Sequence, residues 1–270
     1  MSCRNSVESL ARHRLFLSVG HDEYWSGQQR KNIELARDGP GLNLAFFSGN
    51  EVFWRVRWEN NYRHMVVYKE SQEKVKIDPM LDEWTGTWRD GRPINPVGSQ
   101  PENSLTGTIF TVNAWRHDAL EVPFRFSRHR FWRNTGVAEL KQGEKRIIKP
   151  GLLGHEWDED LDNGFRPPGL VRLSQTTVDN LWMIQDYGAN YDSGTATHSL
   201  VIYRAVSGCL VFGAGTGRVR LGQAGGSLSP LFSSVELGAG SAPRHRHWYS
   251  TRESLPYQHQ GWEGPDGSRD

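Results

Sequence analysis

Cysteine and long apolar runs are both scarce in this 270-residue chain. The two cysteines, Cys3 and Cys209, lie far apart in the sequence, which argues against a disulfide framework and against a cysteine-based zinc site. No apolar run approaches the roughly 18 residues that a membrane-spanning helix needs, and the first residues lack the apolar core of a secretory signal. We therefore expect a soluble, cytoplasmic protein without a membrane partner.

Excess charge and nucleotide-binding motifs are also missing. The chain carries 32 Lys and Arg against 31 Asp and Glu, a formal net charge of +1, so nothing favours a nucleic-acid partner. It has no Gly-Lys-Ser/Thr phosphate loop and no Gly-x-Ser-x-Gly elbow. Gly213 and Gly215 are not followed by a helical pattern, so they do not form a dinucleotide fingerprint.

The most informative pattern present is an apolar run that ends in a glycine and a His-x-Glu pair. Residues 15–19 predict a buried strand, and His21 and Glu23 follow Gly20. Residues i and i+2 of an extended backbone point to the same side, so both side chains should meet at the carboxyl end of this strand. Open α/β sheets bind ligands there. The pair is typical of a metal site or an acid/base pair; alternatively, His21 caps a helix and Glu23 lies in its first turn.

The next residues predict a strand–helix–strand unit. Ser26 is suited to cap a helix over residues 27–38, and a Gly-Pro-Gly sequence at 39–41 ends it. Residues 42–49 are mostly apolar and predict a second buried strand, after which Asn50 begins a loop. Such a βαβ unit places the polar groups that follow the two strands at one edge of the sheet.

An acidic segment at residues 154–160 contains a second His-Glu pair, with Glu156 as its carboxylate. Three interpretations stay open: a hard cation bound through oxygens, one general base for a site built elsewhere, or a solvated acidic loop.

The eleven tryptophans cluster with arginine, as in residues 53–58, and residues 82–102 predict a loop-rich insertion at the sheet edge. Flat rings beside guanidinium groups are typical of packing pairs and of binding surfaces. A non-catalytic module for binding or subunit assembly is therefore an alternative function, with Trp54 and Trp84 on its surface. Residues 217–270 are rich in Gly, Ser, Pro, Arg and His, which predicts a disordered or out-of-frame tail.

Four segments carry a resemblance to a known family: residues 20–26 (GHDEYWS), 45–54 (AFFSGNEVFW), 154–158 (GHEWD) and 211–216 (VFGAGT). Together they resemble the C-terminal region of the large (beta) subunit of N,N-dimethylformamidase. The resemblance covers residues 12–216, which we take as one partial domain. It implies a class I glutamine-amidotransferase-like (flavodoxin-like) open α/β sheet with loop-rich insertions, N-terminally truncated in this chain.

The resemblance also implies a cofactor, a mononuclear Fe(III) held by a tyrosine, a histidine and a glutamate. The histidine and glutamate match His21 and Glu23. The tyrosine is expected upstream of this chain, and Tyr24 is too close to His21 to take its place. Asn50 and Glu156 match polar residues that line the same pocket.

The activity implied is hydrolysis of a small N-substituted formamide, N,N-dimethylformamide giving dimethylamine and formate. Glu156 would move a proton to the departing amine and Asn50 would bind the oxyanion. Phe53 and Trp54 are expected to form an aromatic pocket wall. A small companion subunit and a homo-oligomer are implied as partners. An inactive fragment that lacks the tyrosine is an alternative. A thiol-dependent amidotransferase is set aside, because neither cysteine follows a Gly-x pair at a strand-to-helix turn.

Overall fold

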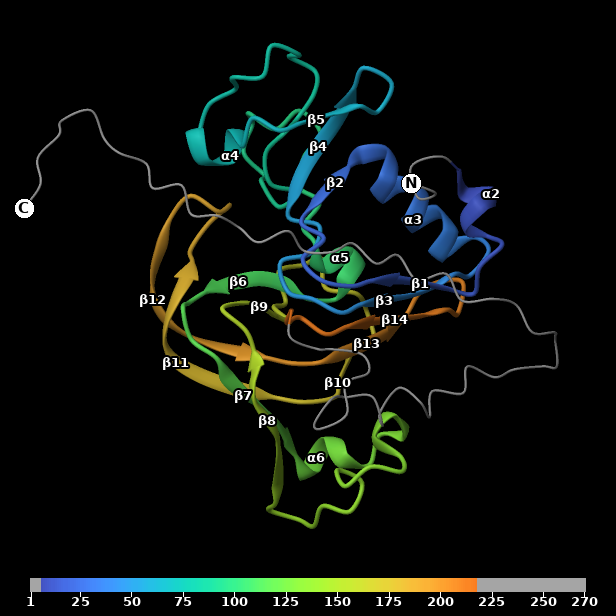
Figure 1. Ribbon diagram of the computed structural model, residues 1–270, viewed down its shortest axis with the longest axis vertical. Helices are drawn as coiled ribbons and strands as arrows, with labels where there is room; N and C mark the ends of the chain where they lie inside the picture. The colour runs from blue at the N-terminus through green and yellow to red at the C-terminus, as the bar shows by residue number, and fades with distance from the viewer. Residues whose placement is uncertain (1–5, 218–270) are drawn as a thin grey trace, which may run out of the picture. The chain divides into compact units, whose positions relative to one another are not determined.

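The computed structural model describes residues 6–217, so the predicted tail falls outside the described residues except for Gly217. Helices are few and short in this part of the chain, and no helix there is long and apolar enough to cross a membrane. Only α3 (Gly27–Asp38) exceeds four residues. The others are α2 (Val7–Leu10), α4 (Glu70–Glu73), α5 (Asn103–Thr106), α6 (Phe124–Ser127) and the 3-10 turn η1 (Arg130–Trp132) (Figure 1).

The strands of residues 6–217 form four sheets. The largest is mixed, in the order β1 (Leu15–Ser18), β3 (Asn43–Phe46), β14 (Leu210–Gly213), β13 (Val201–Arg204) and β10 (Val171–Arg172), of which the first three are parallel. An antiparallel sheet has the order β12 (Tyr191–His198), β11 (Thr176–Ile184), β6 (Ile109–Asn113) and β9 (Glu156–Glu159). A three-stranded sheet has the order β2 (Tyr24–Ser26), β4 (Trp54–Glu59) and β5 (His64–Val66). A two-stranded sheet pairs β7 (Asp118–Pro123) with β8 (Lys145–Leu153). The predicted α/β class is confirmed, with more antiparallel pairing than an open parallel sheet has.

The predicted strand–helix–strand unit is present. β1 pairs in parallel with β3 along its whole length, from Leu15 opposite Asn43 to Ser18 opposite Phe46. The Ser26 hydroxyl accepts the backbone N–H of Gln29 at 3.2 Å and caps α3, which ends at Gly39. The short strand β2 lies between β1 and α3 in the sequence and pairs with β4 in a separate sheet.

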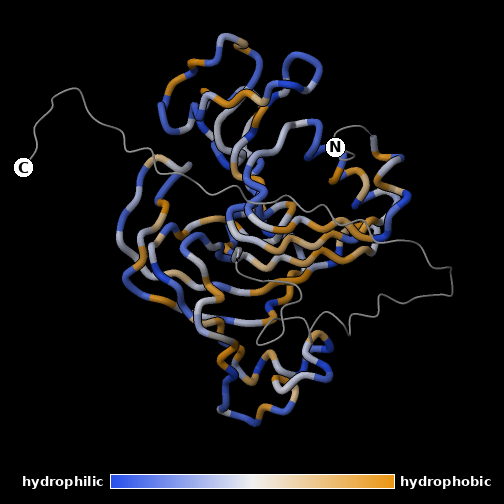
Figure 2. Tube along the Cα trace, viewed as in Figure 1, coloured by the Kyte–Doolittle hydropathy of each residue, from blue (hydrophilic) through white to orange (hydrophobic). Residues whose placement is uncertain are grey.

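Successive side chains of β3 pack into two different hydrophobic clusters. Leu44 and Phe46 pack with Ile33 of α3, whereas Ala45 lies in the cluster that contains residues of the antiparallel sheet. Figure 2 shows this concentration of hydrophobic residues along the large sheet. With both faces covered, β3 is held rigidly, and so is the point where the chain leaves it.

The prediction that the first strand is buried is wrong for one of its faces. Leu15 and Leu17 are 36% and 47% exposed, although the strand itself is where the pattern places it. β1 is the edge strand of its sheet in the described part of the chain. Its pattern of apolar residues does not distinguish an edge strand from a central one.

The tryptophans that the binding-module alternative places on a surface are buried instead. Trp54 is 2% exposed and Trp84 is fully buried. Residues 74–102 contain no helix or strand, in agreement with the loop predicted for residues 82–102, but residues 84–88 within this loop are buried. The Trp84 indole N–H donates to the Thr87 carbonyl at 3.1 Å. Neither ring is free to contact a partner, so the module loses the two residues on which it depended.

Candidate active site

The loops that follow β1 and β3 lie side by side. The backbone N–H of Val52 donates to the Asp22 carbonyl at 3.0 Å, and that of Trp54 donates to the Glu23 carbonyl at 2.9 Å. These bonds continue the parallel pairing of the two strands. His21, Glu23 and Asn50 therefore share one edge of the sheet, as the sequence predicted.

Gly49 lets the second loop approach β9. A Cβ atom at this position would lie 2.9 Å from the Glu156 carbonyl oxygen, 2.9 Å from Trp157 Cα and 3.0 Å from the Gly215 carbonyl oxygen. These neighbours are backbone atoms, which have little freedom to move aside. The absence of a side chain at Gly49 is thus what brings Asn50 to the first residue of β9.

The Glu156 carboxylate is the centre of the resulting group. Its Oε2 atom lies 3.5 Å from His21 Nε2 and accepts a hydrogen bond from Asn50 Nδ2 at 3.3 Å. The His21 and Glu156 side chains are 39% and 19% exposed, so solvent reaches both, whereas Asn50 is buried. An imidazole, an amide and a carboxylate from three segments of the chain converge here.

Glu23 belongs to the same group through its electrostatics. Burial raises the pKa of the Glu23 carboxyl, and the negative charge of Glu156 raises it further. The nearby Lys69 cation and hydrogen bonds from the Trp54 and Asn50 side chains lower the pKa of Glu23 in the opposite direction. Two carboxylates close enough to repel each other are a local excess of negative charge, which a bound cation would relieve.

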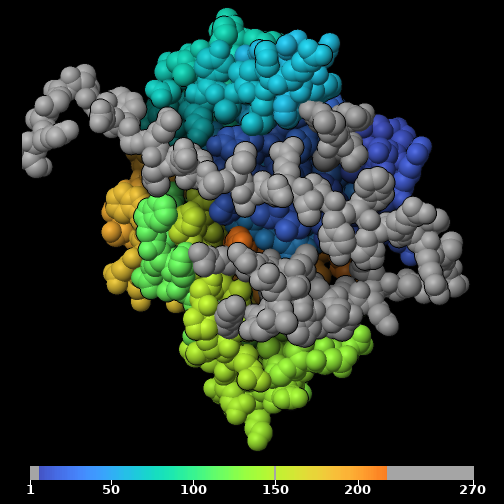
Figure 3. All heavy atoms as spheres, in the orientation of Figure 1, coloured from blue at the N-terminus to red at the C-terminus, as the bar shows by residue number. Residues whose placement is uncertain are grey.

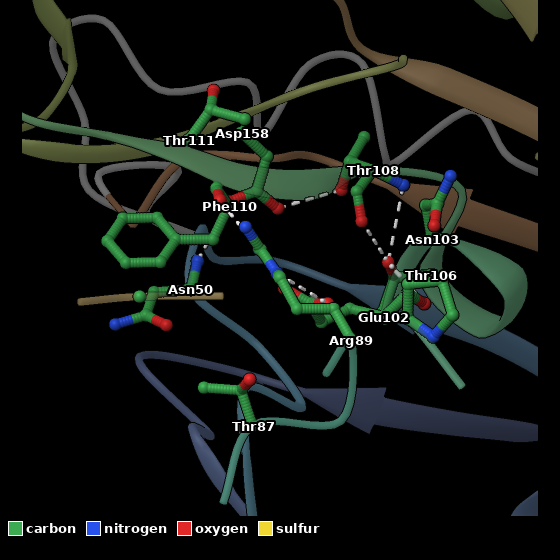
Figure 4. A network of polar contacts seen from close by, with 12 residues as sticks. Asn50, Thr87, Arg89, Glu102, Asn103, Thr106, Thr108, Phe110, Thr111 and Asp158 are labelled. Carbon is green, nitrogen blue, oxygen red and sulfur yellow. Dashed lines mark hydrogen bonds and ion pairs between the residues drawn. The ribbon is translucent and has the colours of Figure 1, made fainter. Parts of the chain in front are cut away.

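Asp158 binds the backbone of Asn50. Its carboxylate accepts the Asn50 backbone N–H at 2.9 Å and the Thr108 hydroxyl at 2.8 Å (Figure 4). Asn50 has a φ of 53°, in the left-handed region that asparagine tolerates better than most residues. Asp158 is 3% exposed, and burial raises the pKa of its carboxyl to about 7. A buried acid therefore fixes the backbone from which the Asn50 amide reaches Glu156.

The interpretation of residues 154–160 as a solvated loop is wrong. Asp158, Glu159 and Asp160 are all buried, and each has its own partners: Glu159 accepts from the Thr111 hydroxyl at 3.0 Å, and Asp160 pairs with Arg172 at 2.5 Å. Because these carboxylates bind donors on different elements, they do not gather around a common point. Within residues 6–217 no group of three or more His, Cys, Asp and Glu side chains is arranged to hold a metal ion.

Sequence reasoning missed Tyr191, which begins β12. The negative charge of Glu156 raises the pKa of the Tyr191 phenol, and burial raises that pKa more strongly, while a hydrogen bond with Asn113 lowers it. Tyr191 therefore lies near Glu156. No local signal marks this residue, because its position follows from the order β12-β11-β6-β9 of the antiparallel sheet.

A stack of rings on the solvent side of His21 was also missed. The Trp115 side chain is 92% exposed and lies parallel to His155, with 5.0 Å between ring centroids. The His155 ring contacts His21 edge-on at 6.2 Å. The His155 ring therefore contacts the His21 imidazole, whose Nε2 atom faces the Glu156 carboxylate.

Glu51, next to Asn50, is a buried acid behind the site. It is 2% exposed, and neither carboxylate oxygen makes a hydrogen bond of ordinary geometry to the described residues. Burial holds the pKa of Glu51 well above its ordinary value, although the Ser18 side chain lowers it. Burial thus favours the neutral form of this carboxyl, which lies on the same loop as Asn50.

The donor set at this edge fits an iron ion in part. His21 and Glu23 offer an imidazole and a carboxylate, the borderline and hard donors that Fe(III) accepts. The two carboxylates Glu23 and Glu156 supply the negative charge that a trivalent cation needs. A third protein ligand would have to come from outside this pair.

Asp158 gives the site a testable dependence on pH. Its folded pKa of about 7 exceeds the unfolded value of 3.8, so its contribution to stability is present below pH 3.8 and is lost as the pH rises through 7. Asp158→Asn keeps an acceptor for the Asn50 N–H and cannot ionise. We expect the stability of this variant, measured by urea unfolding and taken relative to the wild type, to increase steadily from pH 4 to pH 7.

Another buried group changes stability over the same range in the opposite direction. Burial lowers the pKa of His198 to about 4, so its contribution is lost as the pH falls. Comparing Asp158→Asn with the wild type at each pH cancels the His198 effect. A constant difference between the two proteins would contradict the assignment of Asp158 as a buried acid.

Comparison with known proteins identifies a family. The family model described as N,N-dimethylformamidase beta subunit-like, C-terminal, matches residues 3–222. The comparison with curated proteins found no match. The matched span includes every residue of the group around Glu156. The chain belongs to the N,N-dimethylformamidase beta subunit-like C-terminal family.

Proposed function

We propose that this chain is the amide-hydrolysing domain of an iron-dependent hydrolase that acts on small N-substituted formamides. N,N-dimethylformamide, which would give dimethylamine and formate, is the substrate we favour. The observation that carries the proposal is the convergence of His21, Glu23 and Asn50 around the Glu156 carboxylate. Membership of the dimethylformamidase-related family supports the choice of reaction.

His21 and Glu23 are the residues of this chain that we assign to the iron. A ferric ion supplies a Lewis acid that polarises a carbonyl and lowers the pKa of water. The repulsion that raises the pKa of Glu23 supports a cation at this position, because a nearby positive charge would lower that pKa.

Glu156 is the proton carrier in this proposal. It accepts the proton of the attacking water and delivers it to the amide nitrogen, so that the C–N bond breaks and the amine leaves neutral. The Asn50 amide donates to Glu156 Oε2 at 3.3 Å and also hydrogen-bonds Glu23. We assign it as the donor to the developing oxyanion, a role in which the oxyanion replaces one of these two carboxylates. Because Glu156 is 19% exposed, it can exchange protons with solvent between turnovers.

Phe53 and Trp54 are the apolar wall of this proposed pocket. The two rings meet edge to face at 5.0 Å and belong to a buried cluster with Phe110. The Trp54 side chain also hydrogen-bonds Glu23 and lowers its pKa, so the aromatic residues contact one of the two residues assigned to the iron. Because both rings are almost fully buried, they would support this wall from behind the residues that contact a small apolar N-substituent.

The fold family, the cellular location and the partner subunits are also part of the proposal. We infer that residues 12–216 are part of a glutamine-amidotransferase-like sheet in a cytoplasmic protein. The family name refers to a beta subunit, which supports a companion subunit and a multi-subunit, homo-oligomeric enzyme.

The experiment that tests the function is a product analysis. The full chain is loaded with iron, incubated with N,N-dimethylformamide, and assayed for dimethylamine and formate. Hydrolysis requires the two products in equal amounts, because each C–N bond broken yields one of each. Amine without formate, or neither product from a chain that holds iron, would contradict the proposal.

A further inference from the structure

An open cavity of about 620 Å³ lies beside α3 and β4, apart from the group around Glu156. Its volume is typical of small-molecule sites. The helix α3 and the strand β4 contact each other beside this cavity. In Figures 1 and 3, α3 is dark blue and β4 is a lighter blue. Its lining includes Lys31, Arg55, Trp58, Tyr62, Glu83 and Trp88, and none of the residues assigned to the hydrolytic site.

The cavity contains an arginine without an anionic partner. Among the described residues the Arg55 guanidinium makes neither a hydrogen bond nor an ion pair within 4.0 Å; it lies over the Trp88 ring, 5.2 Å from the centroid. Arg30 lies over the same ring at 4.7 Å. Burial lowers the pKa of Arg55, and the charge of Arg30 lowers it further, while Glu83 raises it from beyond ion-pair distance.

The other arginines of the lining are paired. Arg30 binds Glu34 at 2.8 Å and the Gln100 carbonyl at 2.6 Å, and Arg57 pairs with Glu59 at 2.8 Å. The exposed Lys31, like Arg55, has no ion pair within residues 6–217. Two cationic groups in one cavity therefore keep unused hydrogen-bond donors, which is costly for a partly buried guanidinium.

We propose that this cavity binds a small organic oxyanion, a carboxylate or a phosphate. The planar Arg55 fork presents two N–H groups to a pair of oxygens, and Lys31 adds a second positive charge. Trp58 and Tyr62, whose ring centroids are 6.5 Å apart, provide an aromatic wall for the organic part of the ligand. The site requires no iron and does not depend on the proposed hydrolysis.

The test is isothermal titration calorimetry of the full chain with inorganic phosphate and, separately, with benzoate, at ionic strength held constant with chloride. We expect at least one of the two anions to bind, which also distinguishes the phosphate from the carboxylate class. Arg55→Gln is expected to weaken binding about tenfold or more, and Lys31→Gln by a smaller factor. The exposed Arg12, outside the cavity, gives a matched control: Arg12→Gln should bind as the wild type does.

Two further measurements separate binding from folding. Without added anion, Arg55→Gln should unfold at the wild-type temperature or above it, because it removes an unpaired charge. Arg55→Lys keeps the charge but loses the planar fork, so it should bind more weakly than the wild type. Absence of binding by both anions at millimolar concentration, or wild-type affinity in both Arg55→Gln and Lys31→Gln, would overturn the proposal.

Discussion

Glu156→Gln is expected to lower kcat for formamide hydrolysis about 10²–10⁴-fold, the usual contribution of a general acid–base group. The glutamine has almost the same shape, and its carbonyl oxygen can still accept the hydrogen bond that Asn50 Nδ2 donates at 3.3 Å. It cannot take a proton from water or give one to the amine. The measurement is kcat from the release of dimethylamine by the iron-loaded chain, with the unfolding temperature recorded to show that the fold is intact.

A carboxylate far from the site is the matched control for this substitution. Glu73 is exposed at the end of α4, so Glu73→Gln removes the same charge without touching His21 or Asn50. Its kcat should equal that of the wild type. If Glu156→Gln retains kcat within about threefold of the wild type, Glu156 is not the proton carrier.

Gly49→Ala is expected to destabilise the fold by about 3 kcal/mol, the upper end of the range for overpacked interiors. The new methyl group would lie 2.9–3.0 Å from three backbone atoms of Glu156, Trp157 and Gly215. The loop can avoid them only by moving away from β9, which separates Asn50 from Glu156. Urea unfolding gives the loss of stability, and kcat should fall with it.

Another glycine controls for the loss of flexibility in the unfolded chain. At Gly91 a Cβ atom would meet only Ser99 Cβ at 3.5 Å, an ordinary contact distance. Gly91→Ala should therefore change stability by less than about 1 kcal/mol. Equal effects of the two substitutions would show that the approach of Gly49 to β9 is not tightly packed.

The part of the site that is local in sequence could be predicted from the sequence alone. His21 and Glu23 follow β1, Asn50 follows β3, and a parallel βαβ unit brings the ends of two such strands together. The contribution of Glu156 could not be decided in this way. Its segment permitted a cation site, a base or a solvated loop, and only the contact of Gly49 with β9 shows which carboxylate faces Asn50.

Predictions from local composition failed where burial depends on distant segments. Trp84 is buried within the irregular loop of residues 74–102, and Trp54 forms a β-bridge with Thr87 of that loop, although irregular loops are ordinarily found at the surface. Leu17 is exposed because β1 ends its sheet among the described residues. Tyr191 lies near Glu156 because the distant strand β6 pairs with both β9 and β11 in one sheet. Such long-range pairings leave no periodic signal in the segments that form them.

Iron content tests the central claim most directly. The chain and its variants His21→Ala, Glu23→Gln and His64→Ala are incubated with iron, freed of excess metal, and examined by elemental analysis. His64 lies on the exposed strand β5 and serves as the matched histidine control. The account predicts bound iron in the wild type and in His64→Ala, and close to none in the other two variants. Iron absent from the wild type, or retained after loss of His21 and Glu23, would contradict it.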